Sequence, residues 1–589
     1  MKSIHDIGPL VEYWAHDEYF DLATRQEIQA LIRDRNDTEL LDRFYQDLEF
    51  GTGGLRGILG AGINRMNIYT VRRAGQGLAN YLKSNFAGMG EIKLSISYDN
   101  RHQSLEFARE TACVMAANGI TAYLFPELMP TPILSFSVRY LKAQAGVMIT
   151  ASHNPPQYNG YKVYWEDGAQ IIAPHDIGII EQVVAISDYR AIQWIDFQTG
   201  IKQARIRIIE SDLLDAYYGQ VGSLRYRDSV DLSLPIIYTS LHGTGLKPVL
   251  HSLKQRGFTN VKTVPGQTPY DPDFSTVSSP NPENKEALKL AETYARENQG
   301  EIIVATDPDS DRMAVVVFHQ GDYHYLNGNQ TSAIMAYYVF ESLRATNQLP
   351  SRPVLIKTVV TSDLQNQIAA DYQAECIEVL TGFKYIAEQI RIFESESPDP
   401  RHYVFGSEES YGYLLGTFVR DKDAITAVTT LCEMAAYYKT QGLTLIDVLH
   451  SLYDRFGYFT DSLINVSLSG QEGQTRIKTI MQTLRDNPPL TIMDREVVEI
   501  RDYQTRQSTN LRSKRISSLP QPRSNVLTFI LDDESKISAR PSGTEPKIKF
   551  YFGVRIAHPI SLKERILKGD NYIRHLEHAF MNLIQSGQA

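Results

Sequence analysis

Short apolar segments alternate with amphipathic segments along much of the chain. Lys93–Asp99 has the β-rich pattern of a strand, and Leu105–Asn118 after it has the apolar spacing of a helix. The alternation continues with a predicted strand at Ile120–Phe125, a helix at Pro132–Leu141 and a buried strand at Gly146–Thr150. This order predicts βαβ units, and hence a mostly parallel sheet with helices on both faces.

The same alternation returns twice further along the chain. Ile302–Thr306 is a predicted strand that leads directly into an acidic loop. A third block then combines three predicted strands with a long predicted helix, at Val354–Val360, Cys376–Leu380, Tyr403–Phe405 and Ala424–Thr440. The pattern therefore predicts three α/β blocks in succession.

The two ends of the chain have a different pattern. The first 45 or so residues are strongly charged, and their apolar positions predict helices: Leu31, Leu40, Leu41 and Phe44. From about residue 456 the βα rhythm stops, and a polar stretch at 468–525 precedes a predicted strand at 526–531 and a C-terminal helix. This last block is predicted to be a smaller α+β domain.

The length of 589 residues corresponds to about four domains at roughly 150 residues each. We place them at 1–203, 204–322, 323–455 and 456–589. The 59 Lys and Arg and 69 Asp and Glu give a net charge of −10, which provides no general attraction to nucleic acid or to an anionic membrane. We expect neither partner.

Three separated cysteines (Cys113, Cys376 and Cys432) predict buried thiols rather than a disulfide framework or a zinc site. The first 20 residues contain early acids and no apolar core, so we expect no secretory signal. There is no run of about 18 apolar residues that could span a membrane. A cytoplasmic location is the expectation.

A polar loop follows the main predicted strand of each α/β block. These loops are Ala151–Asn154, Asp307–Asp311 and Gly406–Ser410. In open α/β sheets, ligands bind beyond the carboxyl ends of the strands. We therefore expect the three loops to form three walls of one cleft.

Ser152 lies at the mouth of the first of these strands, in a loop that two prolines stiffen. A serine hydroxyl is a weak nucleophile and needs a base or a charged partner. Lys162 is a candidate for proton transfer if desolvation lowers its pKa, and His153 is counted with it among the catalytic candidates. The alternative is a simple turn, because Ser, Asn and Pro are turn formers.

Asp307, Asp309 and Asp311 occupy alternate positions, which would point the same way in an extended segment. Three carboxylates suit a hard cation, and Mg²⁺ is the natural choice beside phosphate. A calcium EF-hand loop is excluded, because it needs Gly and Glu where Arg312 and Phe318 stand. An aspartyl phosphatase of the haloacid dehalogenase type and a solvated acidic turn remain alternatives.

Two further loops contain groups that bind anions. The segment 540–547 combines Arg540 with two hydroxyls and a glycine, and Arg binds phosphate through paired hydrogen bonds. The glycine-rich segment 51–57 lacks the dinucleotide-binding spacing but contains Arg56, which is suited to a phosphate contact. Either loop on its own could be a polar turn.

In their order along residues 45–555, these motifs resemble the α-D-phosphohexomutase family. TASHNPPQYNGYK resembles its phosphoserine loop, DPDSDR its metal loop, GSEES its sugar-selecting loop and RPSGTEPK its phosphate-binding loop. The resemblance implies a four-domain, heart-shaped α/β enzyme, with three related α/β domains of mixed, mostly parallel sheets and a C-terminal α+β domain.

The resemblance also implies residue roles. Ser152 would be phosphorylated and would bind Mg²⁺ together with the three aspartates, while Lys162 and Arg56 would serve proton transfer and phosphate contact. The implied substrate-binding residues are Arg312, Gly382, Lys384, Glu408, Ser410, Arg540, Ser542, Gly543 and Thr544. No obligate protein partner is implied.

The implied reaction interconverts glucose 1-phosphate and glucose 6-phosphate, with glucose 1,6-bisphosphate as intermediate and priming activator. Glu409 between Glu408 and Ser410 resembles the glucose-specific members, whereas the segment VRDKDA (419–424) resembles a long branch that also contains phosphopentomutases. Phosphopentomutase and phosphomannomutase activity are therefore alternatives. A hydrolytic phosphatase using Asp307 and an inactive sugar-phosphate sensor are alternatives from other classes.

Overall fold

The computed structural model describes residues 3–49, 53–468, 470–542, 547–557 and 559–586. Contacts divide the chain into two compact units. The first contains residues 1–225, 232–316 and 412–432, and the second contains 226–231, 317–411 and 433–589. Among the described residues, no helix has both the length and the apolar character needed to cross a membrane.

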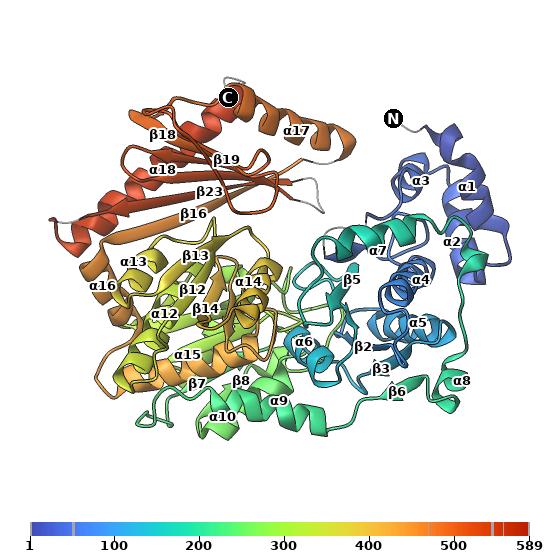
Figure 1. Cartoon of the computed structure of the whole chain (residues 1–589), viewed down its shortest axis with the longest axis horizontal. Coiled ribbons are helices and arrows are strands. Elements are labelled where there is room, and N and C mark those ends of the chain that lie inside the picture. Colours follow the sequence, from blue (N-terminus) through green and yellow to red (C-terminus); the bar gives the residue numbers. More distant parts are fainter. Residues whose placement is uncertain (1–2, 50–52, 469, 543–546, 558, 587–589) are drawn as a thin grey trace. The chain divides into compact units, whose positions relative to one another are not determined.

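Three helices begin the first unit, as expected: α1 (Ile4–His16), α2 (Leu22–Arg33) and α3 (Asp37–Phe44) (Figure 1). Asp21 and Asn36 cap α2 and α3 by accepting hydrogen bonds from backbone N–H groups of the first turn. The helices pack around Trp14, whose ring stacks on Phe20 and meets Phe44 edge-on. This aromatic cluster joins the helices to the sheet domain through Tyr69 of α4.

The first sheet has the strand order β1-β5-β4-β2-β3-β6. The strands β2, β3, β4 and β6 run parallel, whereas β5 is antiparallel to β4 and to β1, so the sheet is mixed as predicted. The strands are β1 (Gly54–Ile58), β2 (Lys93–Tyr98), β3 (Thr121–Leu124), β4 (Ala145–Ile149), β5 (Tyr158–Trp165) and β6 (Ile206–Ile208). The helices of this domain are α4 (Ile68–Asn85), α5 (Ser104–Ala117), α6 (Thr131–Tyr140), α7 (His175–Val184) and α8 (Phe197–Lys202).

The second sheet of the first unit centres on β7 (Ile236–Thr239), which pairs in parallel with β8 (Val261–Thr263) and β9 (Ile302–Thr306). β9 is the predicted strand before the acidic loop, with the predicted bounds, and all five of its residues are buried. The helices of this part are α9 (Asp212–Ser223), α10 (Leu246–Arg256) and α11 (Lys285–Asn298), and β10 (Met313–His319) follows the acidic loop.

In the second unit, β12 (Pro353–Thr358) pairs in parallel with β13 (Glu375–Val379) and β14 (His402–Glu408). All three strands were predicted, but β14 is longer than expected. Gly406 and Ser407 continue the pairing with β12, and the strand ends at Glu408, so these three residues belong to the strand rather than to the loop after it. The helices beside these strands are α12 (Gly328–Ala345), α13 (Leu364–Asp371) and α14 (Phe383–Ser395).

The C-terminal part is a sheet covered by helices. Its longest pair, β16 (Tyr458–Ser467) with β23 (Lys547–Ile556), is antiparallel, and α17 (Gly470–Asp486) and α18 (Leu562–Ser586) pack with it around a core that includes Phe550 and Phe580 (Figure 1). The other strands are β17 (Thr491–Ile492), β18 (Arg495–Asp502), β19 (Gln507–Asn510), β20 (Ile516–Ser518), β21 (Leu527–Leu531) and β22 (Lys536–Pro541). The other strands and α-helices of the described residues are β11 (Asp322–Leu326), β15 (Gly412–Leu415), α15 (Ala424–Lys439) and α16 (Leu445–Phe456).

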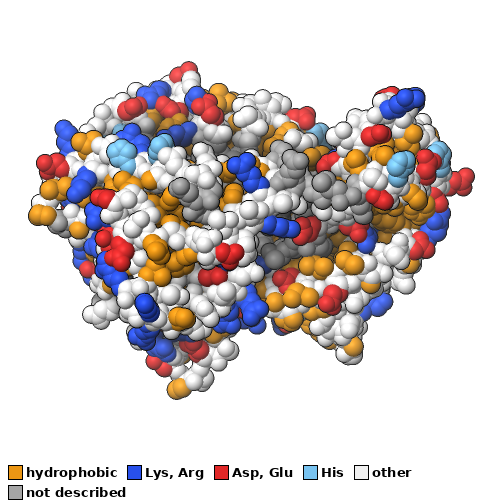
Figure 2. Space-filling view, turned by 90° about the horizontal axis from the view of Figure 1, so that it is seen from above, with side chains coloured by type: hydrophobic (Ala, Val, Ile, Leu, Met, Phe, Trp, Pro, Cys, Tyr) orange, Lys and Arg blue, Asp and Glu red, His pale blue; other side chains and the backbone are white. Residues whose placement is uncertain are grey.

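The chain has a net charge of −10, and the face drawn in Figure 2 carries side chains of both signs. On the face drawn in Figure 2, acidic and basic side chains are interspersed with hydrophobic and uncharged ones. That face therefore resembles an ordinary protein surface, on which apolar atoms also contribute much of the area.

Candidate active site

Ser152 lies just after β4 and is almost fully buried, with 3% of its surface exposed. Its backbone is left-handed, with φ +53°, and its N–H donates to the hydroxyl of Thr150 at 2.8 Å. Its own hydroxyl donates to Oδ2 of Asp307 at 2.8 Å and lies 3.2 Å from Nδ1 of His153. The candidate nucleophile is thus held between an imidazole and a carboxylate.

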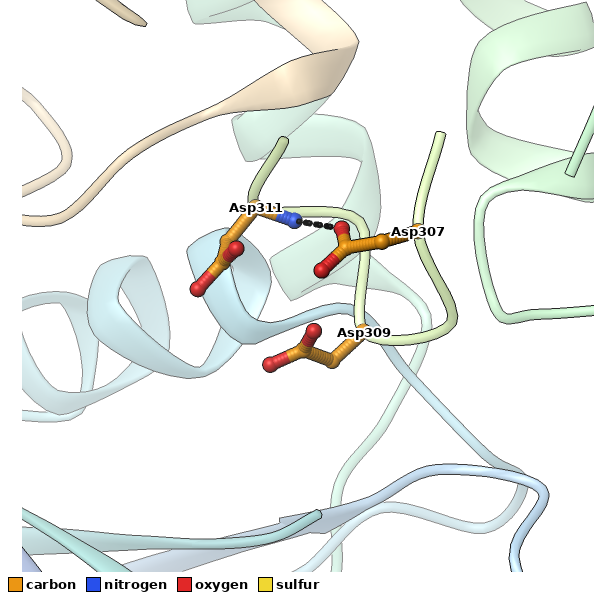
Figure 3. A group of neighbouring side chains, drawn as sticks. All are labelled: Asp307, Asp309 and Asp311. Carbon is orange, nitrogen blue, oxygen red and sulfur yellow. Dashed lines mark hydrogen bonds between the residues drawn. The ribbon is translucent and has the colours of Figure 1, made fainter. Parts of the chain in front are cut away.

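Asp307, Asp309 and Asp311 are brought together, but not by the extended segment that the sequence suggested. The loop is a tight turn, in which the Ser310 N–H bonds back to the Asp307 carbonyl at 3.0 Å and Ser310 has φ +55°. The turn projects the three carboxylates toward one side (Figure 3), and one oxygen of each lies within 4.8 Å of the others. All three residues are buried.

The three carboxylates fit a hard cation for two reasons: oxygen ligands suit such an ion, and two of their oxygens lack hydrogen-bond partners among the described residues. Oδ1 of Asp309 and Oδ1 of Asp311 are buried and have no hydrogen-bond partner among the described residues. Asp307 instead uses Oδ1 to accept the backbone N–H groups of Asp311 and Arg312, at 3.1 and 3.0 Å, which leaves its Oδ2 toward Ser152. Unpaired buried carboxylate oxygens are costly unless a cation satisfies them.

Lys162, on β5, donates to Oδ2 of Asp309 at 2.7 Å and lies 3.5 Å from Oδ2 of Asp311. Burial alone would lower the pKa of Lys162, but the two aspartates outweigh it and raise the pKa. The condition attached to Lys162 in the sequence analysis, that desolvation lowers its pKa, is therefore not met by these contacts. At Asp309, burial would raise the pKa, but the positive charge of Lys162 outweighs it and holds the pKa of that carboxyl far below its ordinary value. At Asp307, burial and the two neighbouring aspartates raise the pKa.

Two other predicted cations also lie at this site. Arg56 of β1 donates to the side-chain oxygen of Asn154 at 3.1 Å, which places it against the Ser152 loop. Arg312 donates to Glu283, and its Nε lies 3.8 Å from Asp311. Arg56 therefore lies beside the Ser152 loop, and Arg312 lies beside the aspartate cluster.

Two contributors were missed by the sequence analysis. Lys422 lies 3.2 Å from Oδ2 of Asp311 and 3.0 Å from Asp421, within the segment 419–424 that was noted only for its resemblance to one branch. Thr131, at the start of α6, donates its hydroxyl to Asp309 at 2.9 Å and its N–H to the Asp309 carbonyl at 2.9 Å. The sequence contains no signal for Thr131, because its partner is 178 residues away.

The second unit contains the predicted sugar-selecting residues. Glu408 is buried at the end of β14, and its Oε1 accepts the N–H of Gly382 at 2.7 Å. Lys384 follows in the first turn of α14, with its Nζ 5.4 Å from the centre of the Tyr385 ring. The structure thus brings Glu408 and the segment Gly382–Lys384 together, with Ser410 two residues beyond Glu408.

The predicted phosphate-binding residues belong to the same unit. Arg540 is near the end of β22, and Ser542 after it donates its N–H to the Lys547 carbonyl at 2.7 Å. Gly543 and Thr544 lie outside the described residues. The predicted roles of all these residues in binding a sugar phosphate stay predictions.

Comparison with known families assigns the α/β domains of the chain. Family models for phosphoglucomutase/phosphomannomutase match three successive segments of the chain. The α/β/α domain I model matches residues 47–190, domain II matches 215–320 and domain III matches 327–456. The three predicted α/β blocks are therefore confirmed as α/β domains of this family.

Similar proteins extend the match over most of the chain. The phosphoglucomutase of Staphylococcus haemolyticus is 38% identical over 514 residues, which cover 87% of this chain and 91% of that protein. The phosphoglucomutase of Staphylococcus aureus (strain MSSA476) is 37% identical over 540 residues, 91% and 95% of the two chains.

Solved structures share the fold. A putative phosphomannomutase from Thermus thermophilus aligns with a TM-score of 0.66 at 20% identity, covering 92% of this chain and 99% of that one. The open form of the Paramecium phosphoglucomutase parafusin aligns with a TM-score of 0.61 at 17% identity, covering 92% and 94%. The α-D-phosphohexomutase resemblance of the sequence is confirmed: the chain belongs to the phosphoglucomutase/phosphomannomutase family.

Proposed function

We propose that the chain is a phosphoglucomutase that interconverts glucose 1-phosphate and glucose 6-phosphate through a phosphorylated Ser152. The observation that carries the proposal is the contact of the buried Ser152 hydroxyl with Asp307, one of three clustered aspartates. The phosphoglucomutases of Staphylococcus, at 36–38% identity over most of the chain, support glucose as the sugar.

In each half of the reaction, one phosphoryl group moves between Ser152 and the sugar. The phosphoseryl O–P bond breaks as an O–P bond forms to the free hydroxyl of the sugar monophosphate, giving glucose 1,6-bisphosphate. The other phosphate of that intermediate then returns to Ser152. Phosphoryl transfer of this kind depends mainly on positioning and charge neutralisation, and the burial of Ser152 would protect the phosphoenzyme from water.

The residues around Ser152 have separate tasks in this proposal. Asp307, Asp309 and Asp311 would hold Mg²⁺, which when bound supplies positive charge against the oxygens of the transferring group. Arg56 and Arg312 add fixed positive charge. Lys162 would take the proton of the attacking sugar hydroxyl, and the departing Ser152 oxygen would take up a proton as its bond to phosphorus breaks. A cation on Asp309 and Asp311 would offset the negative charge that raises the pKa of Lys162.

The family resemblance supports roles for other predicted residues in binding the rest of the substrate. Glu408 and Ser410 would bind sugar hydroxyls, with Gly382 and Lys384 beside them. Arg540, with Ser542, Gly543 and Thr544, would bind the phosphate that does not react in a given half-reaction. Glucose 1,6-bisphosphate would prime an unphosphorylated enzyme.

One coupled assay tests the function. With Mg²⁺ and a trace of glucose 1,6-bisphosphate, the purified chain should convert glucose 1-phosphate to glucose 6-phosphate faster than it converts mannose 1-phosphate or ribose 1-phosphate. A faster reaction on ribose or mannose phosphate would assign the phosphopentomutase or phosphomannomutase alternative. Release of inorganic phosphate without isomerisation would contradict a mutase and support a phosphatase that uses Asp307.

A further inference from the structure

We propose that Arg101 is a positioning residue that holds the Ser152 loop in the left-handed conformation from which the phosphoryl group is transferred. The inference rests on the proposed role of Ser152 as the phosphoryl carrier. It adds a residue that does not touch the reacting atoms and that the motifs of the sequence did not single out.

The guanidinium of Arg101 is shared among four backbone carbonyls, three in the loop between β4 and β5 and one at the first residue of β5. Nη1 donates to Pro155 at 2.9 Å and to Tyr158 at 3.1 Å. Nη2 donates to the carbonyl of Ser152 at 2.6 Å and to that of Asn154. Arg101 therefore joins both ends of the loop that carries the candidate nucleophile, from a residue that is itself only 3% exposed.

The guanidinium is in turn fixed from behind. Its Nε lies 3.4 Å from Oδ2 of Asp99, and both side chains are completely buried. The other oxygen of Asp99 accepts the hydroxyl of Ser104 at 2.8 Å and the N–H of Arg101 at 3.0 Å. The ring of Phe274 covers the guanidinium, with its centre 4.9 Å from the central carbon. The side chain is therefore held on several sides.

Turn hydrogen bonds within the loop and the Ser279 hydroxyl on the His153 carbonyl also hold this segment. Arg101 adds the contacts that tie the Ser152 carbonyl itself to the far end of the loop. A non-glycine residue at φ +53° is in a sparsely populated conformation, which persists only where the surroundings impose it. The residues 150–157 are not in a helix or strand, so their carbonyls are satisfied by turn hydrogen bonds and by side chains such as Arg101. The planar fork of arginine reaches several oxygens at once, which the single ammonium of lysine cannot do with the same geometry.

The consequence is kinetic. If the Ser152 carbonyl loses its partner, the hydroxyl or phosphate of that residue shifts relative to Asp307 and the substrate. A displacement of about 1 Å can cost about a hundredfold in rate. Substrate binding depends on other residues, so the loss should appear in kcat much more than in KM.

The test compares Arg101→Lys with a matched control, Arg65→Lys. Arg65 is also a buried arginine of the first unit, 4% exposed, and it donates to Glu39, Asp42 and the Asn64 carbonyl, all of which lie outside the Ser152 loop. Both variants remove one buried guanidinium and keep one positive charge. For each, kcat and KM for glucose 1-phosphate, the rate of Ser152 phosphorylation by glucose 1,6-bisphosphate and the thermal midpoint are measured.

We expect Arg101→Lys to lower kcat and the phosphorylation rate together by about ten- to hundredfold, with KM changed by less than about threefold. Arg65→Lys should keep kcat within about twofold of wild type, even if its thermal midpoint falls by as much as that of Arg101→Lys. Equal kcat values in the two variants would overturn the proposal. It would also be overturned if the loss of kcat in Arg101→Lys were no larger than the fraction of that variant that is unfolded in the assay.

If Arg101→Lys does not fold, Asp99→Asn is the second variant. It keeps the size of the side chain but removes the ion pair that orients Arg101, so kcat should fall by at least about threefold at unchanged KM. A wild-type kcat in Asp99→Asn would then overturn the proposal. Failure of the proposed function would look different, because wild-type enzyme would carry no phosphate on Ser152 whatever the Arg101 variants do.

Discussion

The hydroxyl of Ser152 and the carboxylate of Asp307 form a hydrogen bond of 2.8 Å, although 155 residues separate them in the chain. Ser152 follows a strand of the first sheet and Asp307 follows a strand of the second sheet of the same unit. Each strand ends in an irregular loop at its carboxyl end, where polar groups are free of the sheet's hydrogen bonding. The site therefore arises where two such strand ends meet.

Ser152→Ala should abolish mutase turnover and leave the fold intact, because the variant removes only the oxygen that would carry the phosphate. Ser95→Ala is a suitable control, since Ser95 is also a buried serine of the first unit, bonded to Ser137. Intact mass should show one phosphoryl group on wild type and on Ser95→Ala, and none on Ser152→Ala. Near-normal turnover in Ser152→Ala would remove this residue from the mechanism.

Chelation of divalent cations should stop the reaction, and added Mg²⁺ should restore it. Asp309→Asn should weaken Mg²⁺ binding by at least about tenfold, about 1.4 kcal/mol, because a neutral amide replaces one of three charged ligands. Calorimetric titration of the apoprotein measures this without any assay of turnover. Asp273→Asn, an exposed site, is the control and should bind Mg²⁺ as wild type does. Full activity in chelator would contradict the metal proposal.

Glu408→Gln should reduce kcat/KM for glucose 1-phosphate by about tenfold or more. The sugar hydroxyls proposed to donate hydrogen bonds to the Glu408 carboxylate would lose a charged acceptor. The Gln amide oxygen can still accept the Gly382 N–H, so the local backbone should be retained. Steady-state kinetics and the phosphate content of Ser152 are measured on the same sample. If phosphorylation falls as much as turnover, Glu408 is structural and not selective.

Arg540→Ala should remove a charge-assisted contact with the non-reacting phosphate, worth about 1.5–3 kcal/mol. The corresponding loss in kcat/KM is about ten- to hundredfold, and it should be similar for glucose 1-phosphate and glucose 6-phosphate. Release of glucose 1,6-bisphosphate into solution should rise. Arg515→Ala, at an exposed position of the same unit, should change none of these quantities. A loss in one direction only, without bisphosphate release, would argue against a common phosphate anchor.

Stability should fall as the pH rises from about 4.5 to about 7 because of Glu409. Burial, together with Glu408, raises the pKa of Glu409 to about 7 from 4.5, although Lys549 and Arg540 act in the opposite direction. Between these values the folded protein binds more protons than the unfolded chain, so the free energy of unfolding decreases with pH. Glu409→Gln should therefore be more stable than wild type at pH 8, by about 1–3 kcal/mol, and similar to it at pH 4.

Thermal or urea unfolding at the two pH values measures this difference. Glu375→Gln is the control, since the side chain of Glu375 is half exposed and pairs at the surface with Arg401. An unchanged difference between Glu409→Gln and wild type from pH 4 to pH 8 would show that Glu409 does not titrate in this window.

Local pattern was enough to identify most of the elements and to single out the candidate reacting groups. The strand β9 was predicted to the residue, and the helix α5 to within one residue at each end, because apolar runs and amphipathic periodicity are local properties. Ser152 and the three aspartates were found because each follows a predicted strand with polar residues that a buried strand would not contain. Their match to known motifs then indicated the family.

Tertiary structure decided how those groups interact. Asp307–Asp311 converge through a tight turn and not through an extended segment, since backbone hydrogen bonds close the turn. The pKa of Lys162 rises instead of falling, because carboxylates from a distant loop lie beside it. Three side chains reach the site from segments that lie 51 to 178 residues from their partners in the sequence: Lys422, Thr131 and Arg101. Neither periodicity nor motif spacing carries information about contacts between residues so far apart in the chain.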